Sequence, residues 1–149
     1  MTQSWMTQKG GDLEQFFKEY ERYANLGDVE GTVSLFAEVF LAADPAGARA
    51  VTAAQLGAGV SQRKRLFESL GSRSTELISL EEKTLDDRYV LATTKWKVGF
   101  DREETKELML ESSFVVHRSE AGPRIVFYLA HESFMDVLKE RGLLPVGKT

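Results

Sequence analysis

The stretch YVLATTKWKVGF, residues 89–100, decides how this chain is expected to fold. Successive side chains of an extended strand point to opposite faces, so alternate residues of this stretch share a face. One face is mainly apolar and the other carries two lysines: the first holds Val90, Ala92, Thr94, Trp96, Val98 and Phe100, and the second Tyr89, Leu91, Thr93, Lys95 and Lys97. This period of two predicts a half-buried β-strand whose Trp96 faces the core.

The segment that follows, residues 105–118, has the same period and is predicted to form a hairpin with this strand through a loop at 101–104. Pairing Phe100 with Lys106 sets the register. The predicted pairs are Trp96 with Leu110, Thr94 with Ser112, Ala92 with Phe114 and, on the opposite face, Lys95 with Glu111. The last pair joins opposite charges across the strands. A slip by one residue would spoil both faces.

The last strand, residues 124–131, has two candidate faces. The more apolar set is Ile125, Phe127, Leu129 and His131, and the other is Val126, Tyr128, Ala130 and Glu132. We place the more apolar set toward the helices. Pairing Val116 with Ile125 then puts Leu129 beside Ser112 and His131 beside Leu110. His131 is therefore expected on the inner face, partly buried, within contact distance of Trp96 or Leu110.

Helical signals dominate the chain before these strands. A capping pattern at Asp12 opens a helix that Gly27 ends, and Asp28 opens a shorter helix. A short strand is expected at 39–42, stopped by the turn at 44–47. Two further helical pieces are expected to begin at Thr52 and Ser61, the second ending at Gly71.

The order of these elements predicts one α+β domain. Helices come first, then a run of antiparallel strands that begins at 74–85, and Ser133 caps a short last helix. The register of the 74–85 strand is ambiguous. We expect a single domain over residues 12–145, with a flexible leader at 1–11 and a tail at 146–149.

Composition narrows the possible partners. The chain has 149 residues, a net charge of −4 and no cysteine, so neither nucleic acid nor an anionic membrane is an expected partner, and disulfides and cysteine nucleophiles are excluded. No apolar run reaches the roughly 20 residues of a membrane helix, and a cytoplasmic location is expected. No phosphate loop, serine elbow or dinucleotide motif is present, and two distant histidines do not make a zinc site. We therefore expect no cofactor and no metal.

Several stretches resemble the nuclear transport factor 2-like superfamily, in particular its SnoaL-like, uncharacterised bacterial branch. They are FFKEYERYANLGDVEGTVSLF at 16–36, ADPAG at 43–47, VTAAQ at 51–55, YVLATTKWKVGF at 89–100 and ESSFVVHRSEAGPRIVFYLAHES at 111–133. The resemblance covers about residues 12–145. It implies a cone, in which a strongly bent sheet wraps the N-terminal helices and leaves a pocket at the wide end. It also implies homodimers through the outer face of the sheet.

The resemblance leaves the chemistry open, because related pockets serve isomerases, cyclases, dehydratases and hydrolases or only bind ligands. Steroid-isomerase-like relatives use a tyrosine on the first helix, an acidic base near the second helix and a second acid on the sheet. Tyr20 fits the first place, and Glu38 or Asp44 fits the second less well. Ser112 and Phe114 occupy the sheet positions, so the third partner is missing. The Asp-Pro-Ala-Gly context favours a turn role for Asp44.

Seven residues are expected to contact a ligand: Tyr20, Phe40, Trp96, Leu110, Ser112, Phe114 and His131. His131 is the best candidate for acid–base catalysis, because imidazole transfers protons near neutral pH. Its derived neighbours are apolar, which favours contact with a ligand over catalysis. His117 is expected on the outer face opposite Tyr89.

Three functions remain open. The first is binding of a small apolar or partly polar organic ligand in the cone, and the second is a cofactor-independent isomerase, cyclase or dehydratase. The third is a protein-interaction module that uses the outer sheet face, which also favours a homodimer. The outer-face residues are Tyr89, Leu91, Thr93, Met109, Ser113, Val115 and Tyr128.

Overall fold

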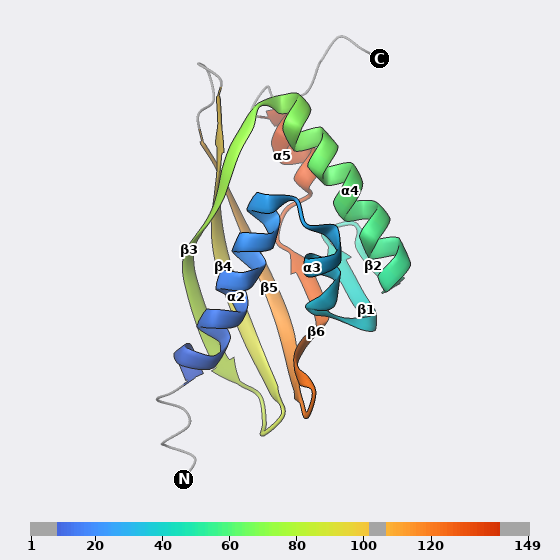
Figure 1. Cartoon of the computed structure of the whole chain (residues 1–149), viewed down its shortest axis with the longest axis vertical. Helices are drawn as coiled ribbons and strands as arrows, with labels where there is room; N and C mark the ends of the chain where they lie inside the picture. Colours follow the sequence, from blue (N-terminus) through green and yellow to red (C-terminus); the bar gives the residue numbers. More distant parts are fainter. Residues whose placement is uncertain (1–8, 102–106, 141–149) are drawn as a thin grey trace.

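The chain forms a curved sheet with α-helices packed against it, as a computed structural model of residues 9–101 and 107–140 shows (Figure 1). Its helices are α2 (Lys9–Leu26), α3 (Val29–Ser34), α4 (Ala53–Leu70) and α5 (Phe134–Glu140). Its strands are β1 (Phe36–Asp44), β2 (Gly47–Thr52), β3 (Ser72–Thr84), β4 (Tyr89–Phe100), β5 (Glu107–Ser119) and β6 (Gly122–Ala130), in the sheet order β2-β1-β6-β5-β4-β3. The predicted α+β architecture, with N-terminal helices against a bent sheet and a short last helix, is confirmed.

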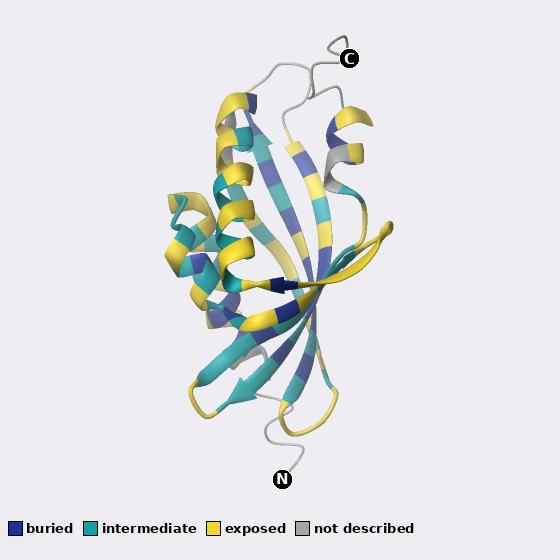
Figure 2. Ribbon diagram, turned by 90° about the vertical axis from the view of Figure 1, so that its right-hand side faces the viewer, coloured by how far each residue is buried: buried dark blue, intermediate teal, exposed yellow. Residues whose placement is uncertain are grey.

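The central hairpin of β4 and β5 has the register that the sequence predicts. Trp96 pairs with Leu110, Thr94 with Ser112, Ala92 with Phe114, and Lys95 with Glu111. Burial along β4 alternates, and every even-numbered residue from Val90 to Phe100 is buried (Figure 2). Trp96 is 6% exposed and packs in the core with residues of α2, so its predicted face is confirmed. The predicted pair of Phe100 with Lys106 lies outside the described residues.

Between β5 and β6 the register shifts by one residue. Val116 pairs with Ile125 as predicted, but the next pair is Val115 with Phe127. Val126 is therefore an extra residue on β6, which makes it a β-bulge. Because side chains alternate between faces, this one residue exchanges the inner and outer faces for the rest of the strand.

The exchange corrects the predicted faces of the closing strand. Tyr128 pairs with Phe114 and Ala130 with Ser112, so both lie on the inner face. Leu129 pairs with Ser113 on the outer face, and His131 follows on that side. The predicted place of His131 beside Trp96 and Leu110 was wrong, as was the predicted outer position of Tyr128. The physical reason is the bulge, since both faces of this strand are apolar and pattern alone does not reveal the shift.

β1 makes the sheet mixed rather than purely antiparallel. It runs antiparallel to β2 and parallel to β6, and it is longer than the predicted strand at 39–42. Asp44 ends β1, and its Oδ1 accepts hydrogen bonds from the backbone N–H groups of Ala46 and Gly47 at 2.8 and 3.3 Å. These bonds account for Asp44 as a turn residue.

α4 is one continuous helix where two helical pieces were predicted. Thr52 caps it, and a capping box with Gln55 is present as the sequence indicates. The helix passes through Ser61 and ends at Gly71, whose φ of 80° suits glycine. Extending an existing helix costs less than starting a new one, so the capping potential of Ser61 is overridden. Likewise α2 begins at Lys9, three residues before the predicted cap at Asp12.

The core lies between α2 and the inner face of the sheet. Leu13, Phe16 and Phe17 of α2 are buried, and the Phe17 ring lies 5.1 Å from that of Phe114 on β5. A second cluster at the other end joins Leu70, Val98, Phe100, Leu108, Val137 and Leu138, which ties α5 to α4 and the sheet. The space between these two packed regions is where the cavity described below opens.

Some predictions fall outside the described residues: most of the leader, the loop after β4, the end of the last helix and the tail. The single-domain boundaries therefore stay a prediction. Among the described helices, none combines the length and the apolar character needed to cross a membrane.

Candidate functional site

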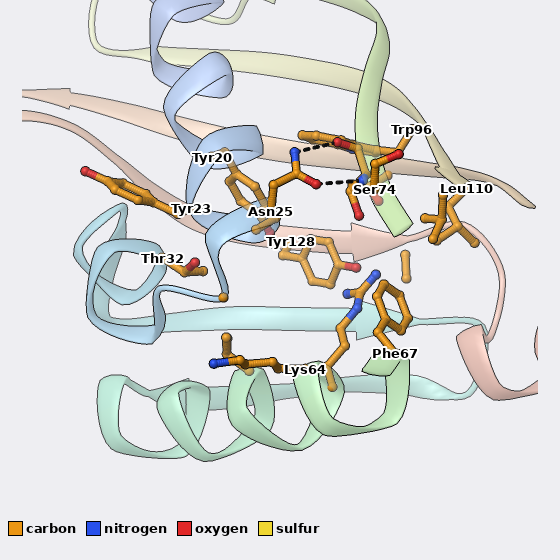
Figure 3. A pocket seen from close by; sticks show the side chains of 18 of the residues that line it. Tyr20, Tyr23, Asn25, Thr32, Lys64, Phe67, Ser74, Trp96, Leu110 and Tyr128 are labelled. Carbon is orange, nitrogen blue, oxygen red and sulfur yellow. Dashed lines mark hydrogen bonds between the residues drawn. The ribbon is translucent and has the colours of Figure 1, made fainter. Parts of the chain in front are cut away.

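A partly open cavity of about 260 Å³ lies between α2, α4 and the inner face of the sheet (Figure 3). Its wall is mainly aromatic. Tyr20 comes from α2, Trp96 from β4, Phe114 from β5 and Tyr128 from β6. Ring centroids lie 5.5 Å apart for Tyr20 and Trp96, 5.6 Å for Tyr20 and Phe114, and 5.2 Å for Phe114 and Tyr128. Such packing holds the rings in place, so the wall is largely preformed.

Hydrogen bonds within the sheet fix the Trp96 indole. Its Nε1–H donates to Thr94 Oγ1 at 2.7 Å, and that hydroxyl donates to the Ser112 carbonyl oxygen at 3.1 Å. Thr94 is 1% exposed, so the indole N–H is satisfied without water. The ring therefore presents its apolar surface to the cavity while its polar atom is occupied by the protein.

Tyr20 contributes a hydroxyl that stays protonated. Burial is the main cause of its raised pKa, the negative charge that Tyr128 would carry raises it further, and the Arg63 guanidinium partly opposes the shift. Tyr20 is accordingly a hydrogen-bond donor at physiological pH and not a base.

Two cations of α4 line the cavity in different ways. The guanidinium carbon of Arg63 lies 5.1 Å from the centre of the Phe67 ring, a cation–π arrangement that orients the guanidinium plane. Lys64 instead runs across Gly27, where a Cβ added to the glycine would come within 2.6 Å of the lysine side chain. Glu68 and Glu132 also line the cavity, and because all four of these charged residues are exposed, water screens their charges.

The end of α2 shapes the mouth of the cavity. Gly27 has a φ of 67°, and the bonds Gly27 N–H to Ala24 O and Asp28 N–H to Tyr23 O close the helix. Two residues before Gly27, Asn25 bridges to the edge strand β3: its Nδ2 donates to Thr75 O at 2.9 Å, and Thr75 N–H donates to its Oδ1 at 2.8 Å (Figure 3). This pair of bonds fixes the distance between α2 and β3.

The structure brings together five of the seven residues predicted to contact a ligand. Tyr20, Trp96, Leu110, Ser112 and Phe114 all line the cavity. Phe40 does not: it is 4% exposed and packs on Phe36, with ring centroids 4.6 Å apart. It belongs to the core beneath β1. Glu38, considered as a base, is an exposed residue of β1 and does not line the cavity either.

His131, the seventh, is an exposed residue on the outer face. Its Nε2 is 2.7 Å from Ser113 Oγ, and its Nδ1 is 3.7 Å from Glu111 Oε1. This row has the residue types of a hydrolytic triad, but Ser113 is only 8% exposed. A nucleophile must be open to its substrate. The row therefore does not make a hydrolase site, and His131 acts as a local hydrogen-bonding partner of the strand end.

The residues that sequence reasoning missed come from α4 and β6. Tyr128 was assigned to the wrong face because of the bulge. Neither Arg63 nor Phe67 was singled out from the sequence. The i, i+4 spacing of Arg63 and Phe67, which puts both on one face of α4, is the sequence feature by which these two residues could have been found. Among the described residues, no group of three or more His, Asp or Glu side chains is placed to hold a metal ion.

The fold is that of a cystatin-like α+β domain, and comparison with known proteins agrees. Residues 11–133 match the family described as NTF2-like protein (DUF6841). The chain belongs to this NTF2-like family, as its resemblance to the nuclear transport factor 2-like superfamily predicted. No protein with a curated description matches the chain.

Solved structures share the fold at low sequence identity. An NTF2-like protein with a cystatin-like fold from Novosphingobium aromaticivorans is 17% identical, with coverage of 97% of this chain and 94% of that chain and a TM-score of 0.71. Aln2 from a Streptomyces species is 15% identical, with coverage of 91% of this chain and 96% of that chain and a TM-score of 0.70. An NTF2-like protein of unknown function from Shewanella oneidensis is 16% identical, with coverage of 83% of this chain and 99% of that chain and a TM-score of 0.67. Identities this low establish the fold alone.

Proposed function

We propose that this chain is a binding domain for a small organic molecule held in the cavity between α2, α4 and the sheet. The observation that carries the proposal is the aromatic wall of Tyr20, Trp96, Phe114 and Tyr128 around a volume of about 260 Å³. Binding sites for small molecules combine an apolar wall with a few polar groups. The volume is below the range of about 300–1,000 Å³ typical of drug-sized ligands, so a molecule of one or two rings fits best.

A cofactor-independent isomerase, cyclase or dehydratase, such as the SnoaL-like branch includes, receives less support. Proton transfer to and from carbon needs a base inside the cavity. The Tyr20 hydroxyl stays protonated, and the carboxylates among the described lining residues belong to Glu68, Glu111 and Glu132, all exposed. Glu111 turns its carboxylate toward His131 on the outer face. Binding without chemistry is the simpler use of this cavity.

Quenching of Trp96 fluorescence by an uncharged two-ring probe tests the proposal. The chain has two tryptophans, so Trp5→Phe leaves Trp96 as the only one. Titration of this variant with 2-naphthamide should quench Trp96 in a saturable manner.

A matched pair of variants on β6 locates the site. Ala130 faces the cavity, so Ala130→Phe should fill it and abolish quenching. Leu129→Phe adds bulk to the outer face and should leave quenching unchanged. Saturable quenching that survives Ala130→Phe, or no quenching in the parent protein, would contradict the proposal.

A further inference from the structure

We propose that the preferred ligand is an uncharged ring compound whose polar group is a neutral oxygen acceptor, hydrogen-bonded by the phenol hydroxyls of Tyr20 and Tyr128. This inference rests on the proposed binding function and names the chemical class of the ligand. It follows from where the charged residues of the cavity stand, and from the positions and the hydrogen-bonding state of its hydroxyl groups.

The charged residues of the cavity lining are all exposed. Among the residues that the structure describes, two cations and three carboxylates belong to this lining: Arg63, Lys64, Glu68, Glu111 and Glu132. Because both signs are present and water reaches each of these residues, their charges are screened. Every buried or half-buried residue of the described lining is uncharged. The wall against which the rings of a ligand would pack therefore offers no buried counter-charge.

A charged group on the ligand is unfavourable against such a wall. It would lose its water without gaining a buried partner of opposite charge, and this desolvation lowers affinity. Tyr20 agrees with this reasoning, because burial is the main cause of its raised pKa and a negative charge is therefore disfavoured at that place. The part of the ligand that enters the cavity is accordingly expected to be neutral.

Three hydroxyl-bearing side chains lie along one stretch of this uncharged wall. The Tyr20 and Tyr128 rings both pack on the Phe114 ring, with centroid distances of 5.6 and 5.2 Å. Ser112 stands two residues before Phe114 on the same face of β5, which places it about 7 Å along the strand. In Figure 3, Tyr128 extends into the space between Tyr20 and Phe67.

These hydroxyl groups have hydrogen-bonding capacity that the protein does not use. Within the described part of the chain, the hydroxyls of Tyr20, Tyr128 and Ser112 make no hydrogen bond to another residue. The Trp96 N–H and the Thr94 hydroxyl, by contrast, are both satisfied inside the sheet. Hydroxyl groups on an otherwise apolar wall need a partner. A neutral oxygen with two lone pairs supplies one without bringing a charge.

Three probes of nearly the same shape test the inference. The ketone 2-acetylnaphthalene carries a neutral oxygen acceptor, 2-naphthoate carries a charged carboxylate, and 2-isopropenylnaphthalene carries no polar group. Calorimetric titration of the parent protein should give an affinity for the ketone at least about tenfold above that for the carboxylate, because the charge would be desolvated without a partner. The hydrocarbon measures binding to the apolar wall alone.

The double variant Tyr20→Phe/Tyr128→Phe removes both phenol hydroxyls and keeps both rings. It should lower the affinity for the ketone about three- to tenfold, as expected for the loss of a modest hydrogen bond. Its affinity for the hydrocarbon should not fall, which also shows that the variant is folded. Tyr89→Phe is the matched control and should change neither affinity, since Tyr89 pairs with His117 and stacks on it away from the cavity.

The outcomes separate the ligand class from the binding function. An affinity for 2-naphthoate equal to or above that for the ketone would overturn the inference, as would a ketone affinity that survives the loss of both phenol hydroxyls. Equal losses of ketone and hydrocarbon binding in the double variant would also overturn it, because the hydroxyls would then be structural. In each of these cases the parent protein still binds a ring compound. If none of the three probes binds the parent protein, the binding function itself fails.

Discussion

Thr94 is the residue on which the geometry of the cavity wall depends most directly. It is 1% exposed, accepts a hydrogen bond from the Trp96 indole and donates one to the neighbouring strand. A buried donor that loses its partner costs about 1–3 kcal/mol. Trp96 lies against Tyr20, so a shift of the indole would be transmitted to the donor group of the cavity.

We expect Thr94→Val to lower the free energy of unfolding by about 1–3 kcal/mol, because the indole N–H is left buried and unpaired. Urea unfolding measures the change. Thr93→Val, on the opposite face of β4, is the control and should have a small effect. In a Trp96→Phe background the cost of Thr94→Val should shrink, since the unpaired donor is gone. Equal costs in both backgrounds would show that this hydrogen bond is not the cause.

At the scale of elements, one extra residue in β6, Val126, explains why the residues of this strand that face the cavity differ from those predicted. The faces of β4 and β5 follow from their period, because apolar and polar residues alternate clearly there. In β6, Ile125, Phe127 and Leu129 alternate with Val126, Tyr128 and Ala130, so both faces are apolar. A bulge at Val126 then leaves no sign in the pattern. The sequence therefore predicts the strand and its starting register, but not which side His131 occupies.

The sequence also predicts the ends of α4 but not the residues that the helix contacts. Its cap at Thr52 and its end at Gly71 are readable, because each has a local cause in hydrogen bonding or backbone conformation. The place of Arg63 in a cavity depends on contacts with α2 and β6, which are far away in the sequence. A basic run on a helix is usually solvated. Only tertiary packing distinguishes Arg63 from its neighbour Arg65.

Asn25 joins the C-terminal end of α2 to the edge strand β3, with bonds of 2.9 and 2.8 Å to the backbone of Thr75. Asn25→Ala should lower the free energy of unfolding by about 1–2 kcal/mol, since two hydrogen bonds, each of modest net energy, are lost at an exposed site. It should also weaken 2-naphthamide binding, because the wall between α2 and β3 can open. Lys18→Ala, at an exposed position of α2, is the control and should change neither property. Unchanged binding in Asn25→Ala would show that the mouth does not depend on this bridge.

At the scale of the whole molecule, the bulge makes the outer sheet face more apolar than predicted. It places Phe127 and Leu129 on that face beside Val115, and the partners of these two residues on β1 are Leu41 and Ala43. Leu41 and Met109 are each 42% exposed. An apolar sheet face of this kind favours burial against a partner, and isologous pairing of two copies is the commonest way to achieve it.

We therefore propose a homodimer through the outer sheet face and expect sedimentation of the parent protein to show dimers at high micromolar concentration. Val115→Glu should shift the protein to monomers, because two like charges would be brought into an apolar interface. Leu85→Glu is the matched control: Leu85 is 51% exposed but follows β3 in a turn, and its substitution should leave the dimer intact. Naphthamide binding should persist in the Val115→Glu monomer, since the cavity opens on the opposite side of the sheet. Dimers that resist Val115→Glu would place the contact elsewhere, and a parent protein that stays monomeric would leave the outer face to a different partner chain.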